Sequence, residues 1–407
     1  MIHCRSCGTQ TKPFMSLGSQ PLANALVNPD DSRSPEKWYE LAPAMCPNCY
    51  LFQLIEQPDS ETMFTERYPF FTSSSRSMSA HFERFGSLLI SERPNIKAKG
   101  FVVEIGSNDG TFLKPFADAG ITHLGVEPSS NVGAIARQRG INTKVSFFGY
   151  ETASEIHAKY GSANLIIAAN VIGHIADIND VGRGVANLLA EDGHFVFEAV
   201  YLGDVLKNTA FDQLYDEHVF TFSGTSVQNA FARHELELID IEHQVVHGGS
   251  MRFFLAHRGQ YPVRPSVAQV LKNEHKDGLN LEETYEKFRC RTETIRKNLI
   301  TQITTLNSNG QFVVGYGATA KSSTILNYCD LGSNNMAWIQ DSTREKQGKL
   351  TPGTHIPIVS PKIFQENYPD FAVLFAWNHQ IEIEEKEQKW RANGGKWITY
   401  VPRVAIQ

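Results

Sequence analysis

Short apolar segments alternate with helical segments through the middle of the chain. Apolar runs cover residues 101–105, 123–126, 164–169 and 194–198, and segments with helical character separate them. Strands that alternate with helices in this way are typical of an α/β fold with a largely parallel sheet. The pattern therefore predicts an α/β domain in this region.

A second α/β pattern follows closer to the C-terminus. Residues 259–265 contain two prolines and a glycine and are predicted to be a linker, and residues 266–307 are charged and helical. New strands are then predicted at 311–315, 336–340, 371–375 and 397–401. The chain therefore contains two α/β units in series.

The amino-acid composition argues against several classes of protein. The chain has 407 residues, 41% of them hydrophobic and 20% charged, which excludes whole-chain disorder. Its formal net charge of −6 argues against a general basic surface for nucleic acid or an anionic membrane. No apolar run approaches the roughly 18 residues needed to span a bilayer, and the start lacks a hydrophobic signal segment. We therefore expect a cytoplasmic protein that binds neither nucleic acid nor membranes.

Four of the six cysteines form two C-x-x-C pairs, Cys4 with Cys7 and Cys46 with Cys49. Each pair can sit on a tight turn, and two such turns supply the four sulfur ligands of a tetrahedral zinc ion. A redox C-x-x-C would normally occur once, beside a βαβ pattern. Because all four ligands would come from the protein, the predicted zinc is structural.

These patterns divide the chain into four segments. We expect a zinc-binding domain at 1–60, a connecting helical segment at 61–98, an α/β domain at 99–258, and a second α/β domain with a leading helix at 266–407.

The predicted strand 101–105 runs into a glycine-rich turn. Gly106 and Gly110 allow close backbone approach to a ligand, and Glu127, after the next strand, can accept both hydroxyls of a ribose. The turn lacks the G-x-G-x-x-G pattern of pyrophosphate binding and carries Asp109, which favours cationic S-adenosylmethionine over NAD. The alternative is a structural turn with incidental acids. The predicted cofactor-binding residues are Glu104, Gly106, Asn108, Asp109, Gly110, Glu127 and Asn170.

Residues 215–218 combine a tyrosine, two acids and a histidine after a predicted strand. His218 can accept a proton near neutral pH, and Tyr215 can donate a hydrogen bond to a developing oxyanion. Glu217 can fix the imidazole tautomer or contact substrate. The alternative is a solvated loop. Elsewhere, His174 follows a strand end, where a single histidine is more often structural.

Two further glycine-rich segments are candidates for substrate contact. Residues 247–252 combine two glycines with a histidine and an arginine that could hold a phosphate, although a simple hairpin turn is the alternative. Residues 315–321 offer backbone donors and a lysine, or simply connect a strand to a helix. The predicted substrate-binding residues are His247, Gly249, Ser250, Arg252 and Lys321.

The order of these motifs resembles a known family. The paired cysteines, residues 104–110, Tyr215-x-Glu217-His218, residues 247–250 and Gly317-Ala318-x-Ala320-Lys321 occur in one order over nearly the whole chain. This order is similar to that of sugar C-methyltransferases that act on nucleotide-linked 4-keto-6-deoxy sugars, including the type that methylates C3 of a dTDP-linked keto sugar in tetronitrose formation. The resemblance implies a zinc-binding domain, a central Rossmann-like S-adenosylmethionine methyltransferase domain and a Rossmann-like C-terminal domain.

The resemblance also implies site residues. It implies His218 as the base, with Tyr215, Glu217 and a tyrosine of the N-terminal region near the sugar. Tyr68 is the only tyrosine of its segment, although Phe70 or Phe71 can occupy the matching position.

Two departures from the family pattern stand out. Asp216 replaces the histidine of Tyr-His-Glu-His, and Thr319 replaces the proline of Gly-Ala-Pro-Ala-Lys.

The expected reaction is methylation of C3 of a dTDP-, GDP- or CDP-linked keto sugar, for branched deoxysugar biosynthesis. A C4 ketone acidifies the neighbouring C–H because charge at C3 or C5 delocalises onto O4, and we expect His218 to remove that proton. The alternatives are methylation at C5, an O- or N-methyltransferase, or a non-enzymatic zinc- and nucleotide-binding regulator. We expect a monomer.

Overall fold

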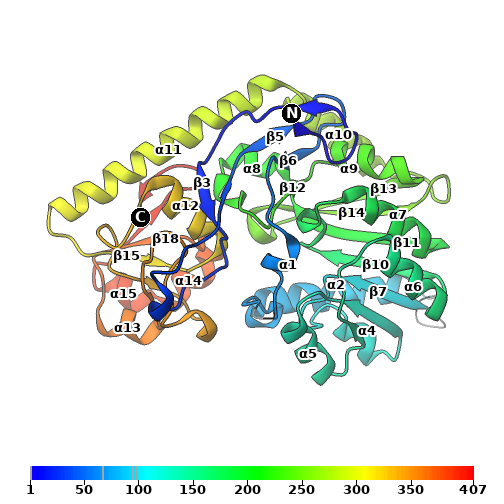
Figure 1. Cartoon of the computed structure of the whole chain (residues 1–407), viewed down its shortest axis with the longest axis horizontal. Helices are drawn as coiled ribbons and strands as arrows, with labels where there is room; N and C mark the ends of the chain where they lie inside the picture. The colour runs from blue at the N-terminus through cyan, green and yellow to red at the C-terminus, as the bar shows by residue number, and fades with distance from the viewer. Residues whose placement is uncertain (1, 67, 94–95, 97–99) are drawn as a thin grey trace.

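The computed structural model describes residues 2–66, 68–93, 96 and 100–407. Figure 1 shows a central domain around one sheet, a C-terminal domain around a second sheet, and an N-terminal segment that runs along both. The predicted connecting segment 61–98 includes residues 67, 94–95 and 97–98, which lie outside the described residues. So do residues 1 and 99, at the starts of two other predicted segments.

The central sheet is built from the apolar runs between residues 101 and 257. Its strands are β7 (Phe101–Ile105), β8 (Thr122–Val126), β9 (Thr143–Lys144), β10 (Ala163–Ala169), β11 (Leu189–Val200), β13 (Leu236–Gln244) and β14 (Ser250–His257). They lie in the order β13-β14-β11-β10-β7-β8-β9, and β14 is antiparallel to both of its neighbours. The four strands predicted from the sequence fall within β7, β8, β10 and β11, and the α/β class is confirmed.

Helices cover both faces of this sheet because alternate strand residues point to opposite sides. Val102 belongs to one apolar core, with residues of α2 (Arg76–Glu92), α4 (Lys114–Asp118) and α5 (Ser130–Gln138). Val103 belongs to the opposite core, with residues of α6 (Tyr150–Tyr160), α7 (Ile178–Leu188), α8 (Leu202–Asn208) and α9 (Gly224–Phe231). The domain is therefore a three-layer sandwich, and the carboxyl ends of its parallel strands share one edge.

The C-terminal domain repeats this architecture on a smaller scale. Its strands are β15 (Val313–Tyr316), β16 (Ile339–Gln340), β17 (Ile358–Val359), β18 (Phe371–Leu374), β19 (Lys396–Thr399) and β20 (Ala405–Ile406), in the order β17-β16-β15-β18-β19-β20. Its helices are α12 (Ala320–Cys329), α13 (Pro361–Glu366), α14 (Gln380–Lys386) and α15 (Gln388–Ala392). All strand pairs are parallel except β19 with β20. The predicted second α/β unit is confirmed.

Two helices join the domains. α10 (Pro265–Lys276) packs on β13 and α9 of the central domain, and the long α11 (Glu282–Ser308) spans from there to α12. Figure 1 shows α11 as the helix that bridges the two domains. The helical character predicted for 266–307 is therefore present, but its first helix packs against the central domain. Among the described residues, no helix is long and apolar enough to cross a membrane.

The N-terminal segment consists of short strands and turns. Its elements are β1 (Ile2–His3), β2 (Gln10–Thr11), β3 (Ser19–Pro21), β4 (Trp38–Glu40), β5 (Pro43–Met45), β6 (Phe52–Leu54) and α1 (Ser60–Met63). β6 also pairs with β12 (Phe220–Thr221) of the central domain, and Val27 bridges to Leu350 of the C-terminal domain. The segment is therefore attached to both larger domains.

Candidate active site

A cavity of about 520 Å³ lies at the carboxyl edge of the central sheet, where all three parts of the chain meet. Asn24 and Tyr68 line it from the N-terminal side, Glu104 and His218 from the central domain, and Lys321 from the C-terminal domain. Ligand sites of open α/β sheets occur at this edge, so the cavity is the candidate active site.

The glycine-rich turn forms one wall of the cavity. Gly106 has a φ of 66°, and a Cβ there would collide with Val171. Asn108 has a φ of 48°, a left-handed conformation that asparagine tolerates. Gly106, Ser107 and Asn108 of this turn line the cavity.

Acidic and amide groups face the cavity beside this turn. Glu127 accepts hydrogen bonds from the backbone N–H groups of Asn108 at 2.9 Å and Ser129 at 2.8 Å. Glu104 and Asn170 each keep one buried oxygen, Oε2 and Oδ1, without a hydrogen-bond partner among the described residues. Burial raises the pKa of Glu104 well above its usual value, and neighbouring Asp109 and Glu127 add to this effect. The free oxygens are acceptors for a cationic or hydroxylated ligand.

Asp109 and Gly110 do not line the cavity. The buried carboxylate of Asp109 accepts from the Ser73 backbone N–H at 3.1 Å and pairs with Arg139 at 3.1 Å. A Cβ at Gly110 would collide with Ile141. Asp109 was expected to face a cationic ligand. Arg139 instead balances its negative charge, and the carboxylate holds the backbone of Ser73.

A short strap, residues 68–74, crosses the turn and includes η2 (Thr72–Ser74). The Asn108 side chain accepts from the Thr72 N–H at 2.8 Å and donates to the Phe70 carbonyl at 3.2 Å. Asn131 donates to the Tyr68 carbonyl at 3.0 Å. The predicted cofactor residue Asn108 therefore also holds the segment that carries Tyr68.

His218 has a defined tautomer. Its Nδ1 lies 2.7 Å from the carbonyl oxygen of Gln213, and its Nε2 lies 2.6 Å from the hydroxyl of Tyr215. A carbonyl oxygen can only accept, so Nδ1 carries the hydrogen and Nε2 accepts from Tyr215. Burial, with the neighbouring His174, holds the pKa of His218 well below its ordinary value. His218 is therefore a neutral imidazole with its basic nitrogen on the Tyr215 side.

Glu217 does not fix this tautomer. Its two oxygens accept from the Tyr68 hydroxyl at 3.0 Å and from Asn24 Nδ2 at 2.6 Å, and burial raises the pKa of its carboxyl. Adjacent side chains diverge, so Glu217 points toward the N-terminal segment while His218 is held by a backbone carbonyl. Asp216 accepts from the backbone N–H of Ala23 at 2.9 Å.

His174 was expected to be structural, and the structure places it in the cavity wall. It belongs to η3 (Ile172–His174), and its ring stacks on those of His218 and Phe64, with centroids 5.2 Å and 5.9 Å away. Burial lowers its pKa to about 4. Its position just after Asn170 was the only sequence signal for this role.

The segment 247–252 divides between two roles. His247 lines the cavity in a left-handed conformation, with φ 56°, and its buried Nε2 has no hydrogen-bond partner among the described residues. Gly249 and Ser250 lie outside the cavity wall. The φ of Gly249 is 122°, and Ser250 donates to the Val246 carbonyl at 3.2 Å. Of these three, only His247 faces the site.

Arg252, expected to hold a phosphate, also lies away from the cavity. It is buried, pairs with Glu198 at 2.6 Å and Glu242 at 2.9 Å, and lies over the ring of Phe85. Two carboxylates already neutralise the guanidinium, which leaves it no charge for a ligand.

The C-terminal domain contributes cations to the cavity. Lys321 lines it from α12 and donates to Asn378 at 2.9 Å. Lys346 also lines it and donates to the Ala318 carbonyl at 2.7 Å. Thr319, at the position where the family has proline, caps α12 by accepting from the Ser322 N–H at 3.2 Å. The predicted Lys321 is therefore joined in the cavity wall by a second lysine, Lys346.

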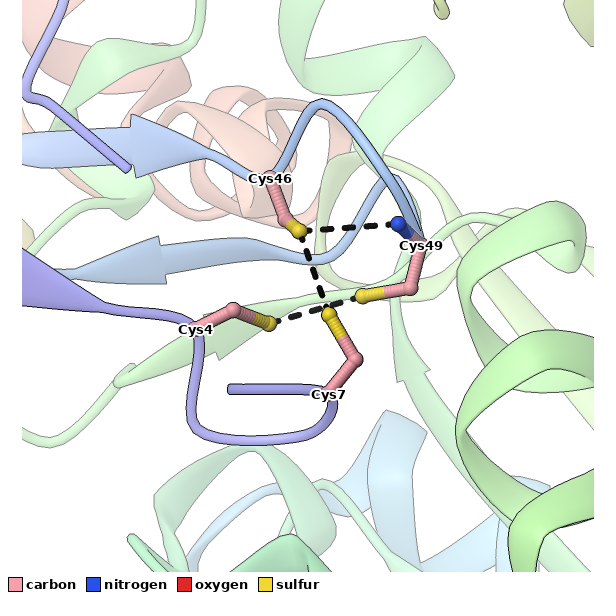
Figure 2. Close-up of side chains that lie close together, drawn as sticks. All are labelled: Cys4, Cys7, Cys46 and Cys49. Atoms are coloured by element: carbon pink, nitrogen blue, oxygen red, sulfur yellow. Dashed lines mark hydrogen bonds between the residues drawn. The ribbon is translucent and has the colours of Figure 1, made fainter. Parts of the chain in front are cut away.

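The four paired cysteines converge in the N-terminal segment (Figure 2). All four sulfur atoms lie within 4.8 Å of one another. Each pair forms the same turn, closed by hydrogen bonds from Gly8 N–H to the Cys4 carbonyl at 2.9 Å and from Tyr50 N–H to the Cys46 carbonyl at 3.0 Å. Zn–S bonds of about 2.3 Å require sulfur atoms about 4 Å apart, so the set fits tetrahedral zinc.

The groups that line the cavity fit the predicted cofactor, S-adenosylmethionine. Glu104 and Asn170 offer free oxygens to an ammonium group, and Glu127 offers a carboxylate to ribose hydroxyls. An uncharged, purely apolar wall would not suit a charged amino-acid tail.

Comparisons with known proteins agree with this architecture. The model "Putative zinc binding domain" matches residues 4–64, "Methyltransferase domain" matches 76–241, and "C-methyltransferase C-terminal domain" matches 245–402. The C-methyltransferase NovU of Streptomyces niveus is 36% identical over 405 residues, which cover 99% of this chain and 96% of NovU.

Solved structures of methyltransferases match part of the chain. The magnesium protoporphyrin IX methyltransferase of Synechocystis PCC 6803 with bound SAM is 10% identical, with a TM-score of 0.34, over 44% of this chain and 79% of that one. An S-adenosylmethionine-dependent methyltransferase of Clostridium acetobutylicum ATCC 824 is 12% identical, with a TM-score of 0.36, over 44% of this chain and 92% of that one.

The sequence match to NovU extends over all three parts of the chain, and the three family models cover the same parts in the same order. The cysteine cluster lies in the first matched region and the glycine-rich turn in the second, and residues of all three regions line the cavity. This chain is therefore an S-adenosylmethionine-dependent C-methyltransferase with a zinc-binding N-terminal domain, and it belongs to the family that includes NovU.

Proposed function

We propose that the chain methylates C3 of a nucleotide-linked 4-keto-6-deoxy sugar, with dTDP, GDP or CDP as the nucleotide. The observation that carries this proposal is a neutral histidine, His218, with its basic nitrogen in a cavity beside the cofactor turn. A general base is what a C-methyltransferase needs, because carbon becomes nucleophilic only after a C–H proton is removed. A ketone at C4 makes that proton acidic enough.

The tautomer of His218 decides which of its nitrogens removes the sugar proton. Nε2 of His218 takes the C3 proton, the C3–H electron pair moves into an enolate, and its charge rests on O4. Nδ1–H stays bonded to the Gln213 carbonyl, which stabilises the imidazolium that forms. Bound S-adenosylmethionine supplies an electrophilic methyl group for the carbon.

Tyr215 acts next to the base. Its hydroxyl donates to His218 Nε2 at 2.6 Å, so it must release this nitrogen when the sugar binds. The hydroxyl can then donate to O4 as negative charge develops there. Burial raises the pKa of Tyr215 well above its usual value, which keeps it a hydrogen-bond donor.

The remaining cavity residues are assigned to the sugar and the nucleotide. Tyr68 and Glu217 form a hydrogen-bonded pair that can orient a sugar hydroxyl. Lys321, Lys346 and the free Nε2 of His247 suit the diphosphate. We propose that the enzyme acts as a monomer.

The test is His218→Gln, with His123→Gln as its matched control. His123 is buried, with Nδ1 2.9 Å from the Ile121 carbonyl and Nε2 accepting from the Asn142 N–H, and it does not line the cavity. Exchange of the sugar C3 proton for deuterium is measured with S-adenosylhomocysteine, and methyl transfer with S-adenosylmethionine. We expect His218→Gln to slow both by roughly 10²–10⁴-fold and His123→Gln to slow neither.

The substrate panel contains dTDP-, GDP- and CDP-linked 4-keto-6-deoxy sugars, and NMR of the product locates the new methyl group. Wild-type rates for His218→Gln would reject this residue as the base. Methylation at C5 would replace the C3 assignment. No activity on any keto sugar would favour an O- or N-methyltransferase.

A further inference from the structure

One buried carboxylate outside the cavity joins the central domain to the C-terminal domain. Asp212 lies in η4 (Phe211–Gln213), is fully buried and does not line the cavity. One of its oxygens, Oδ2, accepts from Trp377 Nε1 at 2.7 Å and from the Tyr400 hydroxyl at 2.7 Å. Trp377 belongs to η8 (Trp377–His379), and Tyr400 follows β19. We call Asp212, Trp377 and Tyr400 the latch.

The latch holds the turn that orients the base. The residue after Asp212 is Gln213, whose carbonyl accepts from His218 Nδ1 at 2.7 Å. The Gln213 side chain donates to the His247 carbonyl at 2.6 Å. One short turn therefore connects the latch to His218 and to the segment that carries His247.

The C-terminal domain also contacts Gly248, beside His247, and Leu214 of the turn. The Trp377 ring lies against Gly248, where a Cβ would collide with it. Thr324 of α12 donates to the Leu214 carbonyl at 2.8 Å. The C-terminal domain therefore forms hydrogen bonds with the residues on both sides of Gln213, Asp212 and Leu214. Residue 248 must be glycine for the Trp377 ring to lie this close.

We propose that Asp212 is a positioning residue, through which the C-terminal domain fixes the tautomer and orientation of His218. The two hydrogen bonds from Trp377 and Tyr400 hold the turn so that the Gln213 carbonyl meets Nδ1. Without them, the turn can rotate, Nδ1–H loses its acceptor, and Nε2 no longer stays the basic nitrogen. The catalytic part of this proposal rests on the proposed function of His218, whereas the tautomer itself does not.

The test is the double variant Trp377→Phe with Tyr400→Phe, which removes both donors and keeps an aromatic ring at each position. The controls are Trp390→Phe and Tyr285→Phe. Trp390 donates to the Pro369 carbonyl at 2.7 Å and Tyr285 to the Leu279 carbonyl at 2.6 Å, and neither contacts the turn. The controls lose similar buried hydrogen bonds, so they report general destabilisation alone.

The first readout is the ¹⁵N NMR signature of His218 in protein labelled with ¹⁵N-histidine, assigned by comparison with His218→Gln. Wild type and both controls are expected to show a protonated Nδ1 and an unprotonated Nε2. The double variant is expected to show a mixture of tautomers. This readout requires no substrate, so it distinguishes failure of the latch from failure of the proposed function.

The second readout is steady-state kinetics of methyl transfer. We expect the double variant to lower kcat by roughly 10–100-fold, as for a misplaced catalytic group, with KM for the sugar within about twofold of wild type. If the double variant does not fold, each single variant is tested instead, and each is expected to give an intermediate mixture of tautomers. An unchanged tautomer in a folded variant, or a kcat that matches the controls, would overturn the proposal.

Discussion

Burial determines the protonation states of single residues around the cavity. It lowers the pKa of His174 and of His247 to about 4, and it holds that of His218 well below its ordinary value. It raises the pKa of Glu104 and Glu217. The histidines are therefore neutral near pH 7, and a neutral imidazole is the form that can remove a proton.

Asp216 gives a prediction at this scale. Burial, with Glu217 beside it, raises its pKa from 3.8 to about 7. The folded state therefore binds the proton more tightly than the unfolded state, and stability is lost as the pH rises from about 4 to about 7. We expect Asp216→Asn to remove this loss, because the amide keeps an oxygen for the Ala23 N–H.

The measurement is urea unfolding of wild type and Asp216→Asn at several pH values. The variant's gain in unfolding free energy should grow from pH 4 to pH 7 and level off above, reaching on the order of 2–4 kcal/mol. Asp31→Asn, at an exposed carboxylate, controls for the change in net charge. A gain that is the same at pH 5 and pH 8 would show that Asp216 does not ionise in this range.

At the scale of elements, a carboxylate from one helix caps another. Glu274 of α10 is buried and accepts from the backbone N–H groups of Gly224 at 2.6 Å and Thr225 at 2.9 Å, at the start of α9. A negative charge at a helix N-terminus is favourable because the first N–H groups lack partners within the helix. This contact helps to hold α10 on the central domain.

We expect Glu274→Gln to lower the free energy of unfolding by about 1–3 kcal/mol, because the amide NH₂ would face backbone donors. Chemical denaturation measures this loss. Glu283→Gln is the control, since Glu283 is exposed on α11 and pairs with Lys287 there. Equal stability of the two variants would mean that the cap contributes nothing.

At the scale of the whole molecule, all three parts of the chain meet at residues 212–218. The N-terminal segment holds Glu217 through Asn24 and Asp216 through Ala23, and the C-terminal domain holds Asp212 through the latch. The zinc-binding domain therefore supports residues 212–218 although its cysteines lie outside the cavity wall.

Removal of the zinc tests whether the zinc-binding domain supports residues 212–218. Purified protein should contain about one zinc per chain, and Cys46→Ser should lose it, because a structural site needs its four ligands. We expect this variant to unfold at a lower temperature, to be cleaved within residues 1–60 by protease, and to lose methyl transfer. Cys290→Ser, at an exposed cysteine outside the cluster, should keep its zinc and its stability. Metal analysis that finds well-folded protein without zinc would contradict the assignment.

The sequence by itself determined the features that are encoded locally. The strands β7, β8, β10 and β11, the turn at 106–110 and the two C-x-x-C turns follow from residues close together in the chain, because apolar runs and glycines act within a few positions. The position of residues 215–218 beside the cofactor turn was also predictable, since the carboxyl ends of parallel strands share one edge.

Only the tertiary structure decided how distant side chains pair. Arg252 and Asp109 were expected at ligands and instead pair with Glu198 and Arg139, because a buried charge is most stable beside an opposite one. Asn24 lies 193 positions from Glu217, its hydrogen-bond partner, and nothing in the local sequence marks such a contact. The acceptor that fixes His218 is a backbone carbonyl, which every residue carries, so only the fold could select it.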